Sequence, residues 1–284
     1  MHYTYEPVSQ AWPTKFLPSH ADTQVLATRP PQSHGTHFVL SEFSVHNRSG
    51  GAAIVGIGGR IASSLWRLYT WTEANYAAGT VLTDDTTDAQ STATGDVNLD
   101  TVGTNNDGVA IGCDMPFSVA SLMISQASTA GTAWKVYYSI ESTGTGFTNN
   151  FKEITNLYVA PDFGSTGEQL IWFEPPTDWH AVKAGTAIVN RHGRSDRTVL
   201  GYDAPSQYLL VVKATTAPNS TRGQMTLATL GRIIFTTVGV ADGGILTNIG
   251  GVEKPLSAGC DAIAACISVA SQQSRADVSY RYSG

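Results

Sequence analysis

Short runs of alternating apolar and polar residues recur along most of the chain, and turn residues such as Gly, Asn, Ser and Pro separate them. Successive side chains of a β-strand point to opposite faces of a sheet, so a period of two predicts strands. The clearest runs are 119–125, 133–140, 168–173, 208–214 and 225–238. No long amphipathic helix interrupts this rhythm between Phe38 and Tyr282, and the pattern predicts less than about 15% helix, against a usual 30–35%.

Three earlier runs, 38–45, 53–61 and 65–71, also predict strands. The second contains Gly56, Gly58 and Gly59, which invites comparison with a nucleotide-binding loop. Ile61 stands where that motif needs its third glycine, and no lysine follows as in a P-loop. The glycines therefore indicate a bulge or a close backbone approach within a strand.

The end of the chain has period-two runs over 263–269 and 278–282. We expect two strands joined as a hairpin through 271–275. A helix over 258–272 is the alternative, because alanine is frequent there.

The first 36 residues differ from the rest. Prolines at 7, 13, 18, 30 and 31 exclude a helix or a central strand, so the segment is predicted to be an extended arm. Its apolar side chains need a surface to bury against, which makes them candidate assembly contacts. These are Tyr3, Tyr5, Trp12, Phe16 and Leu17. Docking on the chain's own body and docking on a neighbouring subunit both remain open, and we expect the neighbour.

A polar tract extends from the strand at 65–71 to about Asp107, and a loop of this length suggests binding or assembly. From Glu73 to Asp114 the chain has eight acidic residues and no Lys or Arg. Asp84, Asp85 and Asp88 could offer oxygen ligands to calcium, but they lack the spacing of an EF-hand loop. A capped, solvated acidic turn is the preferred interpretation.

Together these patterns predict an all-β protein, a β-sandwich of the jelly-roll or a related kind with long polar loops. The arm would be residues 1–36 and the body 37–284, with a possible subdivision into 37–128 and 129–284. A chain of 284 residues is long enough for a sizeable core in either case.

Composition bears on the partners. Charged residues make up 14% of the chain, against about 25% in a typical soluble domain. Such a surface suits a protein largely covered by partners, although a free β-sandwich rich in Thr, Ser and Asn is the alternative. The net charge of −6 argues against nucleic acid as main partner. No apolar run is long enough to span a membrane, and the N-terminus has no apolar core of a secretory signal.

Patterns typical of catalysis or metal binding are missing from the sequence. There is no G-x-S-x-G elbow and no H-E-x-x-H pair, and His34 and His37 would need further metal ligands. The three cysteines fit buried, reduced thiols better than a disulfide framework. We therefore expect no enzyme activity and no cofactor.

One set of segments resembles a known class of module: 134–139, 146–148, 167–173, the corner Pro175-Pro176-Thr177-Asp178-Trp179, and 208–214. The order resembles β-sandwich modules of tailed-bacteriophage virion proteins, in heads, tails and baseplates, and covers about 80 of the 284 residues. Such modules often carry an arginine in the last strand, where this chain has Lys213. Residues 180–204 also form a longer insertion than the module usually has.

The residues of the corner also have structural roles that do not depend on the resemblance. Pro175 and Pro176 end the preceding strand, Asp178 can cap the turn by accepting backbone N–H groups, and Trp179 can bury its ring over the end of the sandwich. We do not expect a catalytic role for Asp178.

The resemblance implies a virion structural subunit that binds further copies of itself and other virion proteins. A head decoration or minor capsid protein is favoured, and a tail or fibre component is the alternative. A carbohydrate-binding adhesin, stacking sugar on Trp66, Trp71 or Trp172, and an enzyme such as a depolymerase are hypotheses of other classes.

Overall fold

The computed structural model describes residues 6–12, 25–28, 37–46, 51–78, 81–92, 95–129, 131–143, 146–182, 206–239, 245–247, 253–268 and 274–283. In these ranges the chain is mostly antiparallel β-sheet, with two short α-helices, α1 (Glu73–Ala78) and α2 (Thr86–Ala89). The prediction of an all-β sandwich is confirmed. Within the same ranges no helix is both long and apolar enough to cross a membrane.

The chain divides into two compact units that each use several separate stretches. Unit 1 consists of residues 1–62, 117–121 and 229–284, and unit 2 of residues 63–116 and 122–228. The suggested subdivision into 37–128 and 129–284 does not match this division. A single cut in the sequence cannot reproduce it, because strands from both ends of the chain pair in unit 1.

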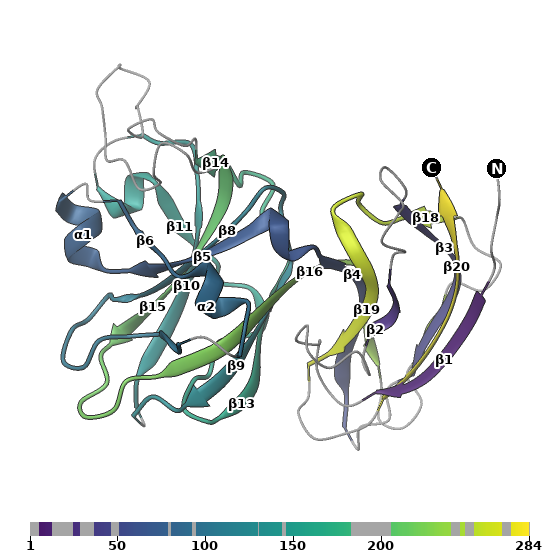
Figure 1. The fold of residues 1–284 in the computed structure, drawn as a ribbon, viewed down its shortest axis with the longest axis horizontal. Helices are drawn as coiled ribbons and strands as arrows, with labels where there is room; N and C mark the ends of the chain where they lie inside the picture. Colours follow the sequence, from purple (N-terminus) through teal and green to yellow (C-terminus); the bar gives the residue numbers. More distant parts are fainter. Residues whose placement is uncertain are drawn as a thin grey trace. The chain divides into compact units, whose positions relative to one another are not determined.

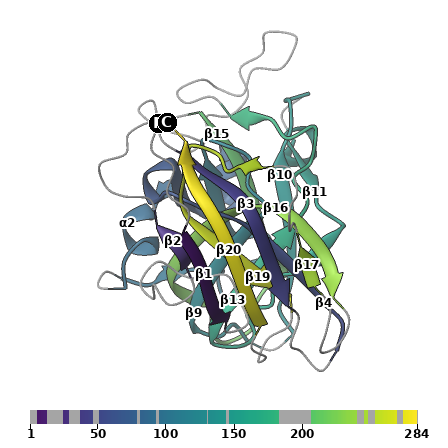
Figure 2. The same cartoon turned by 90° about the vertical axis from the view of Figure 1, so that its right-hand side faces the viewer.

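Unit 1 contains two antiparallel sheets (Figures 1 and 2). One has the order β1 (Glu6–Trp12), β20 (Ser274–Ser283), β3 (His37–His46) and β17 (Ile245–Thr247), with β18 (Lys254–Pro255) also pairing β3. The other continues from β16 (Gln224–Gly239) through β4 (Ala53–Ile61) and β19 (Cys260–Ile267) to β2 (Val25–Thr28). The buried core of this unit includes Phe38, Leu40, Ile57 and Ile263.

Two strands come from the segment expected to be an extended arm. β1 pairs with β20 from Glu6 opposite Tyr280 to Trp12 opposite Ser274, and β2 pairs with β19. Both are edge strands, which suits Pro7 because proline offers no ladder donor. In these two stretches the segment therefore docks on the chain's own body, and the expected docking on a neighbouring subunit is not seen there.

The last two strands are confirmed, but the hairpin between them is wrong. β19 pairs with β4 and β2, whereas β20 pairs with β1 and β3 in the other sheet. The connection therefore passes from one sheet to the other. The helical alternative is also wrong, because Cys260–Ile267 is a strand.

Unit 2 also contains two antiparallel sheets. The first has the order β11 (Phe151–Glu153), β10 (Ala133–Ser139), β15 (Gln207–Thr216), β8 (Gly108–Cys113), β5 (Trp66–Trp71) and β6 (Thr83–Asp84), with β14 (Ala181–Val182) on β15. The second has β12 (Leu157–Val159), β13 (Gly167–Phe173), β9 (Val119–Gln126) and the first part of β16, with β7 (Val97–Asn98) on β16. Two short 3-10 turns are η2 (Ser63–Leu65) and η3 (Phe147–Asn149).

The polar tract after β5 is not one long loop. It contains α1, β6, α2 and β7, and buried apolar side chains fasten it to the unit. Those side chains are Tyr76, Leu82, Ala89, Val97 and Leu99. Ala89, Val97 and Leu99 have polar neighbours on both sides, so the sequence has no periodic apolar pattern that would predict these short elements.

The glycines of β4 mark a close backbone approach, as the sequence indicates. A Cβ on Gly58 would lie 2.0 Å from the carbonyl oxygen of Arg232 on β16. The ladder between these strands shifts register between Ile233 and Phe235, which is a bulge or similar irregularity.

Candidate functional site

The Pro-Asp-Trp corner, residues 175–179, lies between β13 and β14 in unit 2. The ring of Trp179 is 7% exposed and packs among three aromatic rings, those of Phe173, Tyr138 and Tyr208 at centroid distances of 5.8, 6.3 and 5.9 Å. Its Nε1 donates a hydrogen bond to the Leu209 carbonyl at 3.2 Å. Trp179 thus joins the corner to β10, β13 and β15.

Asp178 holds the corner through side chains of β10 and β11. Its carboxylate accepts hydrogen bonds from the Tyr138 hydroxyl at 2.8 Å and from Lys152 Nζ at 3.2 Å. The hydroxyl donor is the main reason why the pKa of Asp178 lies below its usual value. Burial, with the carboxylate adding to it, raises the pKa of Tyr138. The backbone N–H of Asp178 itself also helps to lower the pKa of its carboxyl, and Trp179 N donates to Pro176 O across the turn at 3.3 Å.

A second set of hydrogen bonds ties the residue after the corner to the neighbouring strands. Ser139 Oγ donates to His180 O at 2.6 Å and accepts from Leu209 N at 3.1 Å. His180 N donates to Ser139 O at 2.9 Å. The aromatic strand β10, the strand β13, the corner and the Tyr-led strand β15 therefore form one packed module.

Lys213 lies inside this module, at the position where the resemblance leads one to expect arginine. The residue is 5% exposed, and its Nζ lies 3.3 Å from Glu73 Oε2. The same Nζ lies 3.7 Å from the ring centroid of Phe147 and 5.1 Å from that of Tyr137. A cation over aromatic faces is attracted by the ring quadrupole, so the ammonium is held by both a carboxylate and aromatic rings.

Sequence reasoning did not find this lysine cluster. Its one signal is that Lys213 interrupts an apolar run, Leu209–Val212 followed by Ala214, in which every neighbour is buried. Its partner Glu73 begins α1, and Glu73 N donates to Asp107 Oδ1 at 3.1 Å. The cluster thereby fixes the start of α1 on the sheet.

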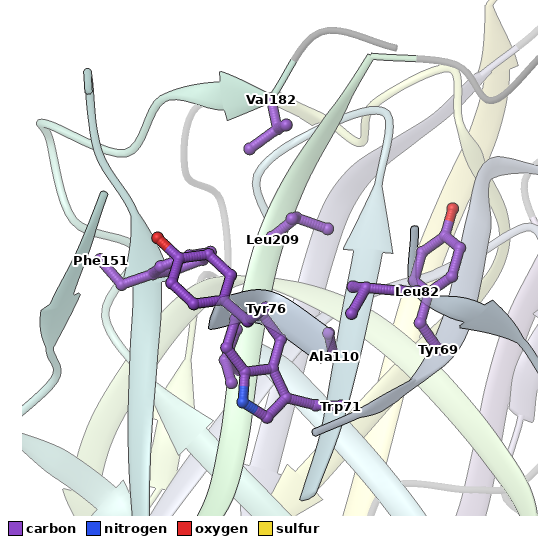
Figure 3. Packing of buried hydrophobic residues seen from close by; sticks show 9 residues of the cluster. Tyr69, Trp71, Tyr76, Leu82, Ala110, Phe151, Val182 and Leu209 are labelled. Carbon is purple, nitrogen blue, oxygen red and sulfur yellow. The ribbon is translucent and has the colours of Figure 1, made fainter. Parts of the chain in front are cut away.

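An aromatic cluster continues from the lysine into the core of unit 2. Trp71 stacks on Tyr76 at 4.9 Å, and Phe151 meets the Trp71 ring edge-on at 5.5 Å. Figure 3 shows these rings together with the aliphatic side chains of the cluster, from Leu82 to Leu209. Rings in this dense packing stabilise a core and leave no face free for a ligand.

Two further groups of unit 2 with raised pKa values, Tyr69 and Asp100, also serve the fold. Burial raises the pKa of Tyr69, whose hydroxyl donates to Gln207 Oε1 at 2.8 Å. Asp100 is 3% exposed and accepts hydrogen bonds from Ser128 Oγ at 2.6 Å and Gly223 N at 2.9 Å. Burial raises the pKa of this carboxyl, and the two donors oppose the shift.

All three cysteines are buried, as expected, and none of them forms a disulfide bond. Burial raises the pKa of Cys113 to about 12. A thiol needs a lowered pKa to supply thiolate at neutral pH, so Cys113 is not set up as a nucleophile.

The acidic turn that could have bound calcium is occupied by hydrogen bonds and an ion pair. Asp84 accepts from Thr86 N at 3.0 Å and pairs with Arg67 at 3.2 Å, and Asp85 accepts from the Thr70 hydroxyl. In the described part of the chain no three His, Cys, Asp or Glu residues gather as a metal site would need. His34 and the side chain of His37 lie outside the described residues.

Three tryptophans were candidates for sugar stacking, and the structure buries all of them. Trp66 is 3% exposed, and Trp71 and Trp172 are 0% exposed. A stacking platform must present a ring face to solvent, so these three residues cannot form one.

The candidate assembly residues lie mostly outside the described ranges. Tyr3, Tyr5, Phe16 and Leu17 fall there, and Trp12 is the last residue of β1, with its side chain not described. Their role in assembly stays a prediction.

Comparison of the chain with protein-family models, with curated proteins and with solved structures finds no match.

Proposed function

We propose that the protein is a structural subunit of a bacteriophage particle, most simply a head decoration or minor capsid protein, and that it acts by assembly rather than by catalysis. Its partners would be further copies of itself and other particle proteins. A tail or fibre position is the second candidate, because the same kind of module recurs in heads, tails and baseplates.

The observation that carries the proposal is that the segments resembling virion modules pack together. These segments are scattered over 134–214. Hydrogen bonds of Trp179 and Ser139 join the corner, the aromatic strand and the Tyr-led strand, and the Trp179 ring packs on Phe173 of the Gly-to-Phe strand. A chance likeness of separate short segments would not require them to share contacts. The cation of the last strand is also present, as Lys213, with Glu73 and Phe147 around it.

The use of polar groups agrees with a structural role. In unit 2, Asp100, Asp178, Tyr69 and Lys213 each hold strands or loops together. Charged residues make up only 14% of the chain, and a surface poor in charge suits burial against partners.

The adhesin hypothesis loses its main support, because Trp66, Trp71 and Trp172 are buried. The enzyme hypothesis gains none from the perturbed groups described above, since each is engaged in packing. Neither is retained as a second function.

The test is quantitative mass spectrometry of purified phage particles from the host that carries this gene. We expect the protein in the particles at a fixed copy number that survives repeated gradient purification. A protein found in the lysate and absent from the particles would overturn the proposal.

A further inference from the structure

An open pocket of about 500 Å³ lies within unit 1, beside β16 and the segment that follows β18. Its walls are mainly apolar, and one guanidinium joins them. The lining includes Ile234, Pro255, Leu256, Ala258, Cys260 and Arg232. This volume falls within the usual range of binding sites, about 300–1,000 Å³.

Arg232 has no carboxylate partner among the described residues, although it is exposed at the pocket. Nearby Arg60 differs, because its guanidinium pairs with Asp261 at 2.9 Å. Lys254 is also exposed beside the pocket, with its Nζ 5.9 Å from the Phe235 ring. The pocket therefore suits a segment that offers an apolar side chain next to a carboxylate.

The two units carry different charge. Unit 1 holds 8 basic and 7 acidic residues, a net charge of +1, so the total of −6 leaves −7 on unit 2. Complementary surfaces steer association and fix which patches meet. A second copy of the chain thus brings an acidic unit 2 that complements Arg232 and Lys254, the exposed cations beside the pocket of unit 1.

One place on unit 2 combines an exposed apolar side chain with surface carboxylates. Among the described residues the exposed large apolar side chains are Val81, Val102, Tyr158 and Val238. Val81 and Val102 fall within the acidic stretch 73–114. Close to Val102 in the sequence, Asp100 and Asp107 are buried, at 3% and 5% exposure. Asp84, three residues after Val81, has a side chain that is 45% exposed and pairs with Arg67 at 3.2 Å. An ion pair between two such exposed groups contributes little, so Asp84 can exchange this partner for another cation.

The strand that follows Val81 is also an open edge. β6 pairs with β5 alone and ends its sheet, so one side of its backbone has no ladder partner in the described part of the chain. Edge strands are a common place for another chain to join.

We propose that the pocket of unit 1 receives the β6 edge of unit 2 from a second copy, with Val81 against the apolar walls and Asp84 facing Arg232. The contact joins two different patches, so it is heterologous and repeats from copy to copy into a ring or a filament. The inference rests on the proposed function as an assembling subunit, and it names the surfaces through which copies meet.

The test is sedimentation of the purified full chain and of two variants, Arg232→Glu in the pocket and Val81→Asp at the edge. We expect wild type to associate, more weakly at high salt, and each variant to lose at least about tenfold in association constant, the effect of 1.4 kcal/mol. The matched controls are Val102→Asp, whose parent side chain is 42% exposed against 43% for Val81, and Arg222→Glu in unit 2. Both controls should associate like wild type.

Mixing the two variants separates a head-to-tail contact from any other. The Arg232→Glu variant keeps an intact β6 edge, and the Val81→Asp variant keeps an intact pocket. One molecule of each can therefore make a single contact with the other, so a mixture should form a 1:1 dimer that grows no further. Circular dichroism of each variant checks that it folds, and a variant that fails this check is replaced by Asp84→Asn or Leu256→Asp.

The inference is overturned if wild type stays monomeric, if both variants associate like wild type, or if the two variants mixed remain monomers. Particle mass spectrometry judges the proposed function separately. If the protein is present in particles and its Arg232→Glu variant still assembles normally, the proposed function stands and the pocket contact is ruled out. If the protein is absent from particles, the proposed function itself is ruled out.

Discussion

The two units stabilise antiparallel sheets in different ways. Unit 2 fills its interior with aromatic rings and ties buried polar groups to one another, as around Trp179 and Lys213. The described core of unit 1 is mainly aliphatic, with Leu40, Ile57 and Ile263 among its buried side chains. Both units place glycine where strands approach closely: a Cβ on Gly58 of unit 1 would meet the backbone of β16, and one on Gly108 of unit 2 would lie 2.0 Å from the Val212 carbonyl oxygen. The loss of a ring should therefore cost most in unit 2, whereas an atom added at a close-approach glycine should be costly in either unit.

The largest expected effect is the loss of the corner ring in unit 2. Trp179→Ala should lower the free energy of unfolding by about 3–5 kcal/mol, as for other large core truncations. Chemical denaturation measures it, with Tyr158→Ala as control because Tyr158 is 39% exposed. A loss below about 1 kcal/mol for Trp179→Ala would mean that the ring is not part of the core.

The corresponding change in unit 1 adds a methyl group. Gly58→Ala should cost about 1–3 kcal/mol, because the new Cβ would lie 2.0 Å from the Arg232 carbonyl oxygen, which cannot move as a side chain can. Gly51→Ala is the control, since nothing lies within 4 Å of its Cβ position. Equal denaturation midpoints for the two variants would refute the close approach.

The lysine cluster gives a smaller effect. Glu73→Gln removes the charge opposite a buried ammonium, and we expect a loss of about 1–2 kcal/mol, reduced from the value for a fully buried pair because the Glu73 side chain is 36% exposed. The Lys135–Glu153 pair has side chains that are 46% and 35% exposed, so Glu153→Gln should change stability less. A larger loss for Glu153→Gln would contradict this ranking.

The smallest effect is a pH dependence from Asp100. Its pKa is raised by burial, so the folded state holds the proton more firmly than the unfolded state does. The stabilisation linked to that proton is present below the unfolded value near 3.8 and is lost as pH rises through the folded pKa. Unfolding free energies of wild type and Asp100→Asn, measured from pH 3 to 7, should differ in this sense, with wild type losing relative stability as pH rises. No change in the difference across that range would show that Asp100 has an ordinary pKa.

Local pattern predicted the strands well and their partners poorly. The run at 119–125 became β9 (Val119–Gln126), and 225–238 became the single strand β16, because period two is visible within a few residues. Whether β19 pairs with β20 depends on β4, some 200 positions earlier in the chain, and the sequence contains no local sign of that choice.

The same limit applies to the candidate site. The corner could be predicted from its prolines and tryptophan, but the side chains that its carboxylate binds on β10 and β11, Tyr138 and Lys152, could not. Lys213 meets Glu73 across 140 positions, so only the folded chain brings this pair together. Val81 and the pocket of unit 1 likewise become visible only through exposure and shape.

Electron microscopy of purified particles tests most directly the proposal that this chain is a building block of a phage particle. We predict density in a symmetric, repeated position that fits each unit by itself, with the Trp179 corner module recognisable in unit 2. Particles that are complete, infectious and mapped at side-chain detail with no such density would contradict the account.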